Sequence, residues 1–152
     1  MEEREIRLFK PSIDSEELAS IKEAFDRQWL GLGPTVSKFE SEWSSYIGTK
    51  HSIAVNSATA ALHLALSSFN FPKGKNVLVP AITFVATATA VMYNGLKPIF
   101  VDVDPNTVSM DLSDLKRKIN KDTVAVIPVH MGGYPVPMDK LNRIAKENDL
   151  VV

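Results

Sequence analysis

Residues 76–103 read NVLVPAITFVATATAVMYNGLKPIFVDV, with two short apolar runs on either side of an alanine-rich segment. The runs Asn76–Val79 and Pro98–Val103 have the length of buried strands, and Phe84–Tyr93 has the composition of a helix. The Asn-Gly pair that follows is typical of a helix end. A strand, a helix and a second strand in this order predict two parallel strands joined by a crossover helix.

The same alternation extends in both directions from this unit. The predicted strands are His51–Val55, Thr123–Val129 and the beginning of a further one at Leu150–Val152, and the predicted helices are Ser57–Ser68, Leu112–Ile119 and Met138–Asn148. Strands that are almost continuously apolar are expected where helices cover both faces of a sheet. The sequence therefore predicts an α/β fold with a parallel-type sheet covered by helices. Because Leu150–Val152 looks like the opening of a strand, we expect the sequence to be part of a longer protein.

The first 50 residues have a different pattern. Asp14 and Glu17 have the spacing of a capping box and predict a helix over Ser15–Gln28. A second helix is expected from Pro34, with Gly48 as its left-handed end. We therefore expect a helical segment at 1–50 and an incomplete α/β domain at 51–152.

Composition excludes several classes of protein. The 152 residues have a net charge of -1, so no basic excess favours nucleic-acid binding. The absence of cysteine excludes disulfides, thiolate metal sites and thiol catalysis. The most apolar stretch, Val77–Val103, is interrupted by Pro80 and Gly95, which argues against a membrane span. We expect a soluble cytoplasmic protein.

Ligands of open parallel sheets bind beyond the carboxyl ends of the strands. Four stretches are expected at that edge, namely Asn56–Ala60, Pro80–Phe84, Asp102–Pro105 and His130–Tyr134. In the first, a strand would lead directly into a helix, whose first N–H groups and dipole favour an anion. Ala58 and Ala60 are small enough for close approach, and Ser57 or Thr59 could add a hydroxyl donor. The alternative is that Ser57 or Asn56 is a simple helix cap.

The other stretches also have two interpretations each. Phe84 could stack on a flat cofactor or pack in the core. His130 could bind substrate and transfer protons, or have a structural role. Asp102 and Asp104 could be paired functional carboxylates, but without a third ligand nearby they are better explained as loop-capping acids, and no metal site is expected.

Taken together, these stretches resemble the DegT/DnrJ/EryC1/StrS family of sugar aminotransferases, which use pyridoxal 5'-phosphate. The resemblance covers nearly the whole chain, in family order and spacing. It rests on three stretches, WLGLGPTVSKFESEWSSYIGTKHSIAVNSATAALHLAL, VLVPAITFVATATAVMYNGLKPIFVDVDPNTVSMD and VIPVHMGGYPVPMDKL. It implies the N-terminal part of the large domain of a fold-type-I pyridoxal-phosphate enzyme.

The resemblance also implies roles for single residues. Ala58 and Thr59 would hold the cofactor phosphate, Phe84 would stack on the pyridine ring, and His130 would approach the cofactor or substrate. The family's lysine that forms the Schiff base with the cofactor has no counterpart in this chain, so the chain alone is expected to be inactive. The intact protein is expected to be a homodimer that transfers an amino group, from glutamate, to a nucleotide-linked keto-sugar for polysaccharide or glycan precursors.

Three alternatives stay open at this point. Some relatives are sugar dehydratases in which histidine replaces that lysine, at a position that would follow Val152. The chain could instead be a non-catalytic interaction fragment that pairs through Trp29–Ile47. A nicotinamide-binding α/β domain is disfavoured because no G-x-G-x-x-G motif is present.

Overall fold

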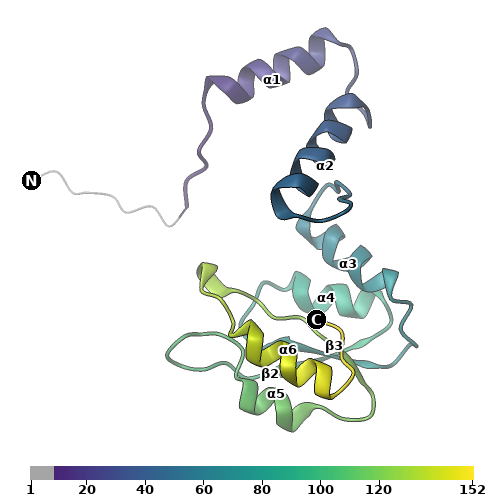
Figure 1. Cartoon of the computed structure of the whole chain (residues 1–152), viewed down its shortest axis with the longest axis vertical. Helices are drawn as coiled ribbons and strands as arrows, with labels where there is room; N and C mark the ends of the chain where they lie inside the picture. Colours follow the sequence, from purple (N-terminus) through teal and green to yellow (C-terminus); the bar gives the residue numbers. More distant parts are fainter. Residues whose placement is uncertain (1–8) are drawn as a thin grey trace, which may run out of the picture. The chain divides into compact units, whose positions relative to one another are not determined.

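The computed structural model describes residues 9–152 and contains two compact units, the first ending at Ala54 and the second running from Val55 to Val152. Each unit is considered by itself. The first contains helices α1 (Ser15–Asp26) and α2 (Pro34–Ile47), which Figure 1 draws at the purple and blue end of the chain. Among the described residues of this unit none is buried.

The start of α1 and both ends of α2 form as the sequence predicts, whereas α1 ends at Asp26 and not at Gln28. The Asp14 carboxylate accepts a hydrogen bond from the N–H of Glu16, and the Glu17 carboxylate accepts one from the N–H of Asp14, which completes the capping box. Helix α2 begins at Pro34, and its last residue is followed by Gly48, whose φ of 77° lies in the left-handed region that favours glycine.

The predicted strand at His51–Val55 is wrong. These residues adopt no regular structure, and Ile53 is 82% exposed. A strand requires a neighbouring strand for its backbone groups, whereas here the N–H of Ala54 donates to the Glu40 carboxylate of α2 at 2.8 Å. The apolar residues of this segment therefore do not extend the sheet.

The second unit contains the sheet. Its elements are α3 (Ala58–Ser68), β1 (Asn76–Pro80), α4 (Ala86–Tyr93), β2 (Lys97–Val101), α5 (Leu112–Lys118), β3 (Thr123–Val126), the short 3-10 helix η1 (Met131–Gly133) and α6 (Met138–Glu147). The three strands are parallel in the order β2-β1-β3, with Leu78 of the central strand opposite Ile99 and Val126. The α/β fold class is confirmed. At the outer edge, Val151 forms an isolated parallel bridge with Ala125.

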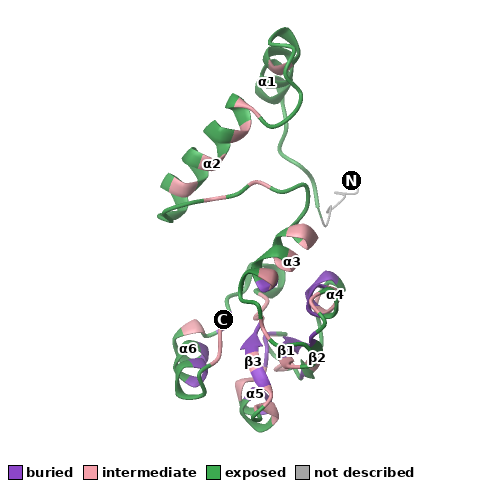
Figure 2. Ribbon diagram, turned by 90° about the vertical axis from the view of Figure 1, so that its right-hand side faces the viewer, coloured by how far each residue is buried: buried purple, intermediate pink, exposed green. Residues whose placement is uncertain are grey.

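Helices cover both faces of this sheet, as alternate residues of β1 show. Leu78 packs in a cluster with residues of α5 and α6, of which Leu115, Leu141 and Ile144 are buried. Val77 and Val79 point to the opposite face and pack with residues of α3 and α4, of which Leu66, Ala90 and Val91 are buried. Figure 2 shows the buried residues gathered in the strands and in the helices of this unit.

Several elements are shorter than the sequence predicts, for identifiable reasons. Helix α4 begins at Ala86 because Phe84 belongs to a turn, in which its carbonyl accepts from the N–H of Thr87. Strand β3 ends at Val126, and Pro128 just beyond it has no N–H for a ladder. In residues 9–152 no helix has the length and apolar character needed to cross a membrane.

Candidate functional site

The carboxyl end of β1 is a position at which the topology predicts a ligand site. The connection after β1 leads to α4 on one face of the sheet, whereas the connections after β2 and β3 lead to α5 and α6 on the other face. Neighbouring strands whose connections leave toward opposite faces create the usual ligand-binding crevice of open α/β sheets. The β1–α4 connection is therefore the first place to look for a bound ligand.

Phe84 lies in that connection and is 76% exposed. The alternative that it packs in the core is therefore wrong, since neither buried cluster includes its side chain. An exposed aromatic ring beside such a crevice offers a flat apolar surface at little conformational cost. This geometry suits stacking against a planar ligand.

The start of α3 has both features that its sequence suggested, a capped helix end and N–H groups that could bind an anion. The Ser57 hydroxyl accepts from the N–H of Ala60 at 3.1 Å, so Ser57 is a true helix cap. Within the described part of the chain, the N–H groups of Ala58 and Thr59 have no recorded partner, as expected for a first helical turn. Ala58 is exposed and Thr59 is half-buried. Capping by Ser57 thus leaves two N–H groups for an anion.

Asn94, which the sequence marked only as a helix end, links α3 to α4. Its side-chain NH₂ donates to the His63 carbonyl at 3.2 Å, and its side-chain carbonyl accepts from the Ser67 hydroxyl at 2.6 Å. His63 and Tyr93 also lie with ring centroids 5.6 Å apart. Because no strand precedes α3 among residues 9–57, these contacts and the apolar packing on α4 fix its position over the sheet.

His130 is exposed and has a structural contact. Its Nδ1 accepts from the N–H of Val136 at 3.1 Å, across the loop formed by η1. Gly132 and Gly133 adopt φ values of 59° and 84°, which permit the tight turn between His130 and Val136. With Nδ1 acting as acceptor, the neutral ring carries its proton on Nε2. The structural and functional interpretations are therefore compatible, because Nε2 keeps a donor.

The acidic residues after β2 cap loops, as the sequence indicated. Asp104 accepts from the N–H groups of Asn106 and Thr107 at 2.8 and 3.1 Å. No group of three or more His, Cys, Asp or Glu residues that could hold a metal ion occurs in residues 9–152.

The sequence missed the carboxylate with the most contacts in this region. Asp114 is buried, although its helix reads as a charged surface segment. It accepts from the N–H of Asp102 at 2.7 Å and pairs with Lys118 and Arg117 at 2.8 and 3.0 Å. The Asp102 N–H first, and then Lys118, hold the pKa of this carboxyl below its ordinary value. Asp114 thus fixes the end of β2 against α5.

The structure brings only some of the predicted residues to one edge. Phe84, Asp102 and His130 all follow the carboxyl ends of adjacent parallel strands. Ala58 and Thr59 come from α3, on the same face as α4. Two cavities of this unit are lined by other residues. One lies between α5 and α6, and a second lies beside α3 and the β3 edge.

Comparison with known proteins gives a consistent answer. Residues 11–152 match the DegT/DnrJ/EryC1/StrS aminotransferase family. The chain is 39% identical over 142 residues to the spore coat polysaccharide biosynthesis protein SpsC of Bacillus subtilis, covering 93% of this chain and 36% of that protein. It is 36% identical to GDP-perosamine synthase of Caulobacter vibrioides, covering 97% of this chain and 40% of that one.

Two solved structures share the fold. The putative sugar aminotransferase Spr1654 from Streptococcus pneumoniae, in its PLP form, superposes with a TM-score of 0.88 at 30% identity over 97% of this chain and 38% of its own. GDP-4-keto-6-deoxymannose-3-dehydratase with a trapped PLP-glutamate geminal diamine gives a TM-score of 0.90 at 26% identity over 96% of this chain and 39% of its own.

The chain therefore spans well under half the length of the relatives that it matches. The match to the family nevertheless begins at residue 11 and continues to the last residue, with both units included. The chain belongs to the DegT/DnrJ/EryC1/StrS aminotransferase family.

Proposed function

We propose that this chain forms the cofactor-phosphate and ring-stacking part of a pyridoxal-phosphate-dependent aminotransferase acting on nucleotide-linked keto-sugars. The observation that carries the proposal is the exposed Phe84 in the connection that follows the carboxyl end of β1, in a chain of this family. The family relation supplies the reaction class, and the geometry supplies the residues that would hold the cofactor.

The residues present fit pyridoxal phosphate. The N–H groups of Ala58 and Thr59 lie in the first turn of an 11-residue helix, where the helix dipole favours a phosphate. The Thr59 hydroxyl can add a further donor. Phe84 offers its ring face to the pyridine, and an all-carbon ring stacks without requiring a hydrogen-bond partner. When bound, the cofactor supplies the electron sink for amino transfer.

The remaining residues of the proposed site would contact the bound cofactor or substrate, or hold the start of α3 in position. His130 retains a donor at Nε2, which suits a contact to the cofactor or to a sugar oxygen. Asn94 holds α3 and is therefore a positioning residue for Ala58 and Thr59. The lysine that moves the proton in this family has no counterpart here, so we expect the 152 residues alone to be catalytically inactive.

The relatives support the proposed substrates and pathway. GDP-perosamine synthase and SpsC, whose names refer to a sugar nucleotide and to polysaccharide biosynthesis, support a nucleotide-linked keto-sugar and a role in polysaccharide or glycan precursor synthesis. The neighbour with trapped glutamate supports glutamate as amino donor. We place the protein in the cytoplasm, where such nucleotide-linked precursors are made.

We also propose that the intact protein is a homodimer. Aromatic residues of α2 are exposed, and Phe39, Trp43 and Tyr46 form a continuous run with ring centroids 6.2 and 6.0 Å apart. An exposed aromatic run of this kind is typical of an interaction surface. A truncated fragment that only pairs with intact subunits would use the same surface.

A sugar dehydratase is the second candidate, because a solved dehydratase superposes as well as the aminotransferase does. The two chemistries differ in their products. An aminotransferase yields an amino sugar and 2-oxoglutarate from glutamate, whereas a dehydratase removes the elements of water from the sugar.

The test is a reaction with full-length protein, meaning the chain with whatever its gene encodes beyond Val152. The protein is incubated with pyridoxal phosphate, glutamate and nucleotide-linked 4-keto-sugars, and the products are identified by mass spectrometry. An amino sugar formed with stoichiometric 2-oxoglutarate supports the proposal. A dehydrated sugar supports the second candidate, and no product from any keto-sugar contradicts both. Phe84→Ala should lower activity at limiting cofactor, and Phe9→Ala, at an equally exposed phenylalanine, should not.

A further inference from the structure

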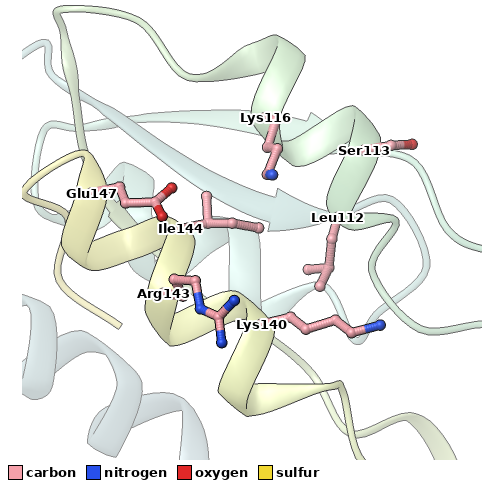
Figure 3. Close-up of a pocket in the computed structure, with 7 residues that line it drawn as sticks. All are labelled: Leu112, Ser113, Lys116, Lys140, Arg143, Ile144 and Glu147. Atoms are coloured by element: carbon pink, nitrogen blue, oxygen red, sulfur yellow. The ribbon is translucent and has the colours of Figure 1, made fainter.

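A cationic groove lies between α5 and α6, on the face of the sheet opposite α3 and α4. Its volume is about 380 Å³, within the range of small-molecule sites. The lining residues are Leu112, Ser113, Lys116, Lys140, Arg143, Ile144 and Glu147. Figure 3 shows Glu147 at one end and Lys140 at the other, with Lys116 and Arg143 projecting between them from the two helices.

The three basic side chains are available for a ligand. No ion pair recorded for residues 9–152 involves Lys116, Lys140 or Arg143. By contrast, the neighbouring cations Arg117 and Lys118 of α5 both pair with Asp114. The groove therefore keeps a local excess of unpaired positive charge, whereas the two cations beside it share the Asp114 carboxylate.

The other polar groups near the groove are mostly occupied. The Asp111 carboxylate accepts from the N–H and the hydroxyl of Ser113 and does not line the groove. Asp114 is committed to its own contacts at the end of β2. Glu147 is the one carboxylate that lines the groove, against three cations. This balance favours an anion placed toward Lys140 and away from Glu147.

We propose that this groove binds a phosphate-bearing anion. The planar Arg143 guanidinium can bind two phosphate oxygens at once, and the two lysines add point charges from both helices. Leu112 and the buried Ile144 form an apolar wall behind them. The groove lies on the opposite face of the sheet from α3 and α4, and neither Phe84 nor the start of α3 lines it, so this site is separate from the proposed cofactor site.

The test uses the ¹⁵N-labelled chain and nuclear magnetic resonance. Sodium pyrophosphate should shift amide signals of α5 and α6 in a saturable way, and less so at high salt. The variant K140Q/R143Q should bind about fivefold more weakly, whereas Lys146→Gln, an exposed cation of α6 outside the groove, should bind as the unchanged chain does. Glu147→Gln should bind about twofold more tightly, since it removes the opposing charge.

A nucleoside diphosphate, titrated in parallel, distinguishes the two sources of phosphate. Tighter binding at the same amides than pyrophosphate identifies a nucleotide, and equal binding identifies the inorganic anion. Shifts confined to the start of α3 or to the β1–α4 connection would overturn the groove as the site without affecting the proposed enzyme activity. Equal weakening in K140Q/R143Q and Lys146→Gln, or no effect of Glu147→Gln, would also overturn it.

Discussion

The two units of this chain use apolar residues in opposite ways. In residues 55–152, β1 and the helices on either face of the sheet bury two separate apolar clusters. In the described part of the first unit, α1 and α2 also have apolar residues at helical spacing. Their side chains nevertheless stay exposed, with Leu18 at 68%. Periodicity thus predicts that a helix forms, and it does not tell what the apolar stripe packs against.

This contrast separates stability from association. Burial of apolar area stabilises the second unit directly, by roughly 25 cal/mol per Å² removed from water. The stripes of α1 and α2 contribute little within their own unit, since they remain in contact with solvent. They are better suited to contacts outside the unit, such as the proposed homodimer.

The largest expected effect compares one leucine from each unit. Leu141→Ala removes a fully buried side chain of α6 and should lower the free energy of unfolding by about 2–5 kcal/mol. Leu18→Ala, in the exposed stripe of α1, should change it by less than about 0.5 kcal/mol. Urea unfolding followed by circular dichroism measures both. Equal losses in the free energy of unfolding would show that Leu18 is packed like a core residue, and would contradict the difference between the two units.

Asp114 extends the comparison of buried and exposed positions to a polar side chain. Asp114→Asn removes a buried charge that holds the end of β2 to α5, and should cost about 1–3 kcal/mol. The matched control is Asp26→Asn, which breaks an exposed pair with Lys22 and should cost less than about 0.5 kcal/mol.

The pH dependence of the Asp114 contribution has a definite sign. Its pKa is lowered in the folded state, so the contribution is complete above the unfolded value of about 3.9 and is lost as pH falls through the lower folded value. The stability difference between wild type and Asp114→Asn should therefore shrink below about pH 4. A difference that grew on acidification would contradict this assignment.

Local signals in the sequence were sufficient for much of the fold. The capping box at Asp14 and Glu17 and the left-handed Gly48 are short-range features, and both form as predicted. The strand at His51–Val55 was wrong because pairing depends on a distant partner that composition does not reveal.

The candidate site was predictable only in part, for the same reason. Phe84 and His130 follow strands, and local order along the chain places them at the carboxyl edge. The role of Asn94 depends on contacts with His63 and Ser67, which lie 31 and 27 residues away in sequence. The burial of Asp114 likewise depends on the end of a strand 12 residues earlier.

The smallest expected effect on stability concerns the contacts by which Asn94 links α4 to α3. Asn94→Ala removes the contacts to α3 and should destabilise the second unit by about 1 kcal/mol. Asn142→Ala, at an exposed position of α6, should have almost no effect. Hydrogen exchange should show faster exchange in α3 than in α6 for Asn94→Ala only. Uniform loss of protection across the unit would show that Asn94 does not act on α3 specifically.

The most direct test of the central claim is calorimetric titration of the chain with pyridoxamine 5'-phosphate and with pyridoxamine. Both ligands carry an amine in place of the aldehyde, so neither can make a Schiff base with surface lysines. The titration therefore measures only the phosphate contacts and the ring stacking. We expect the phosphate form to bind at least about tenfold more tightly, because it alone engages the N–H groups of Ala58 and Thr59. Phe84→Ala should weaken both ligands, and Phe9→Ala neither. Equal affinities for the two ligands, unchanged in Phe84→Ala, would contradict the assignment of this cofactor site.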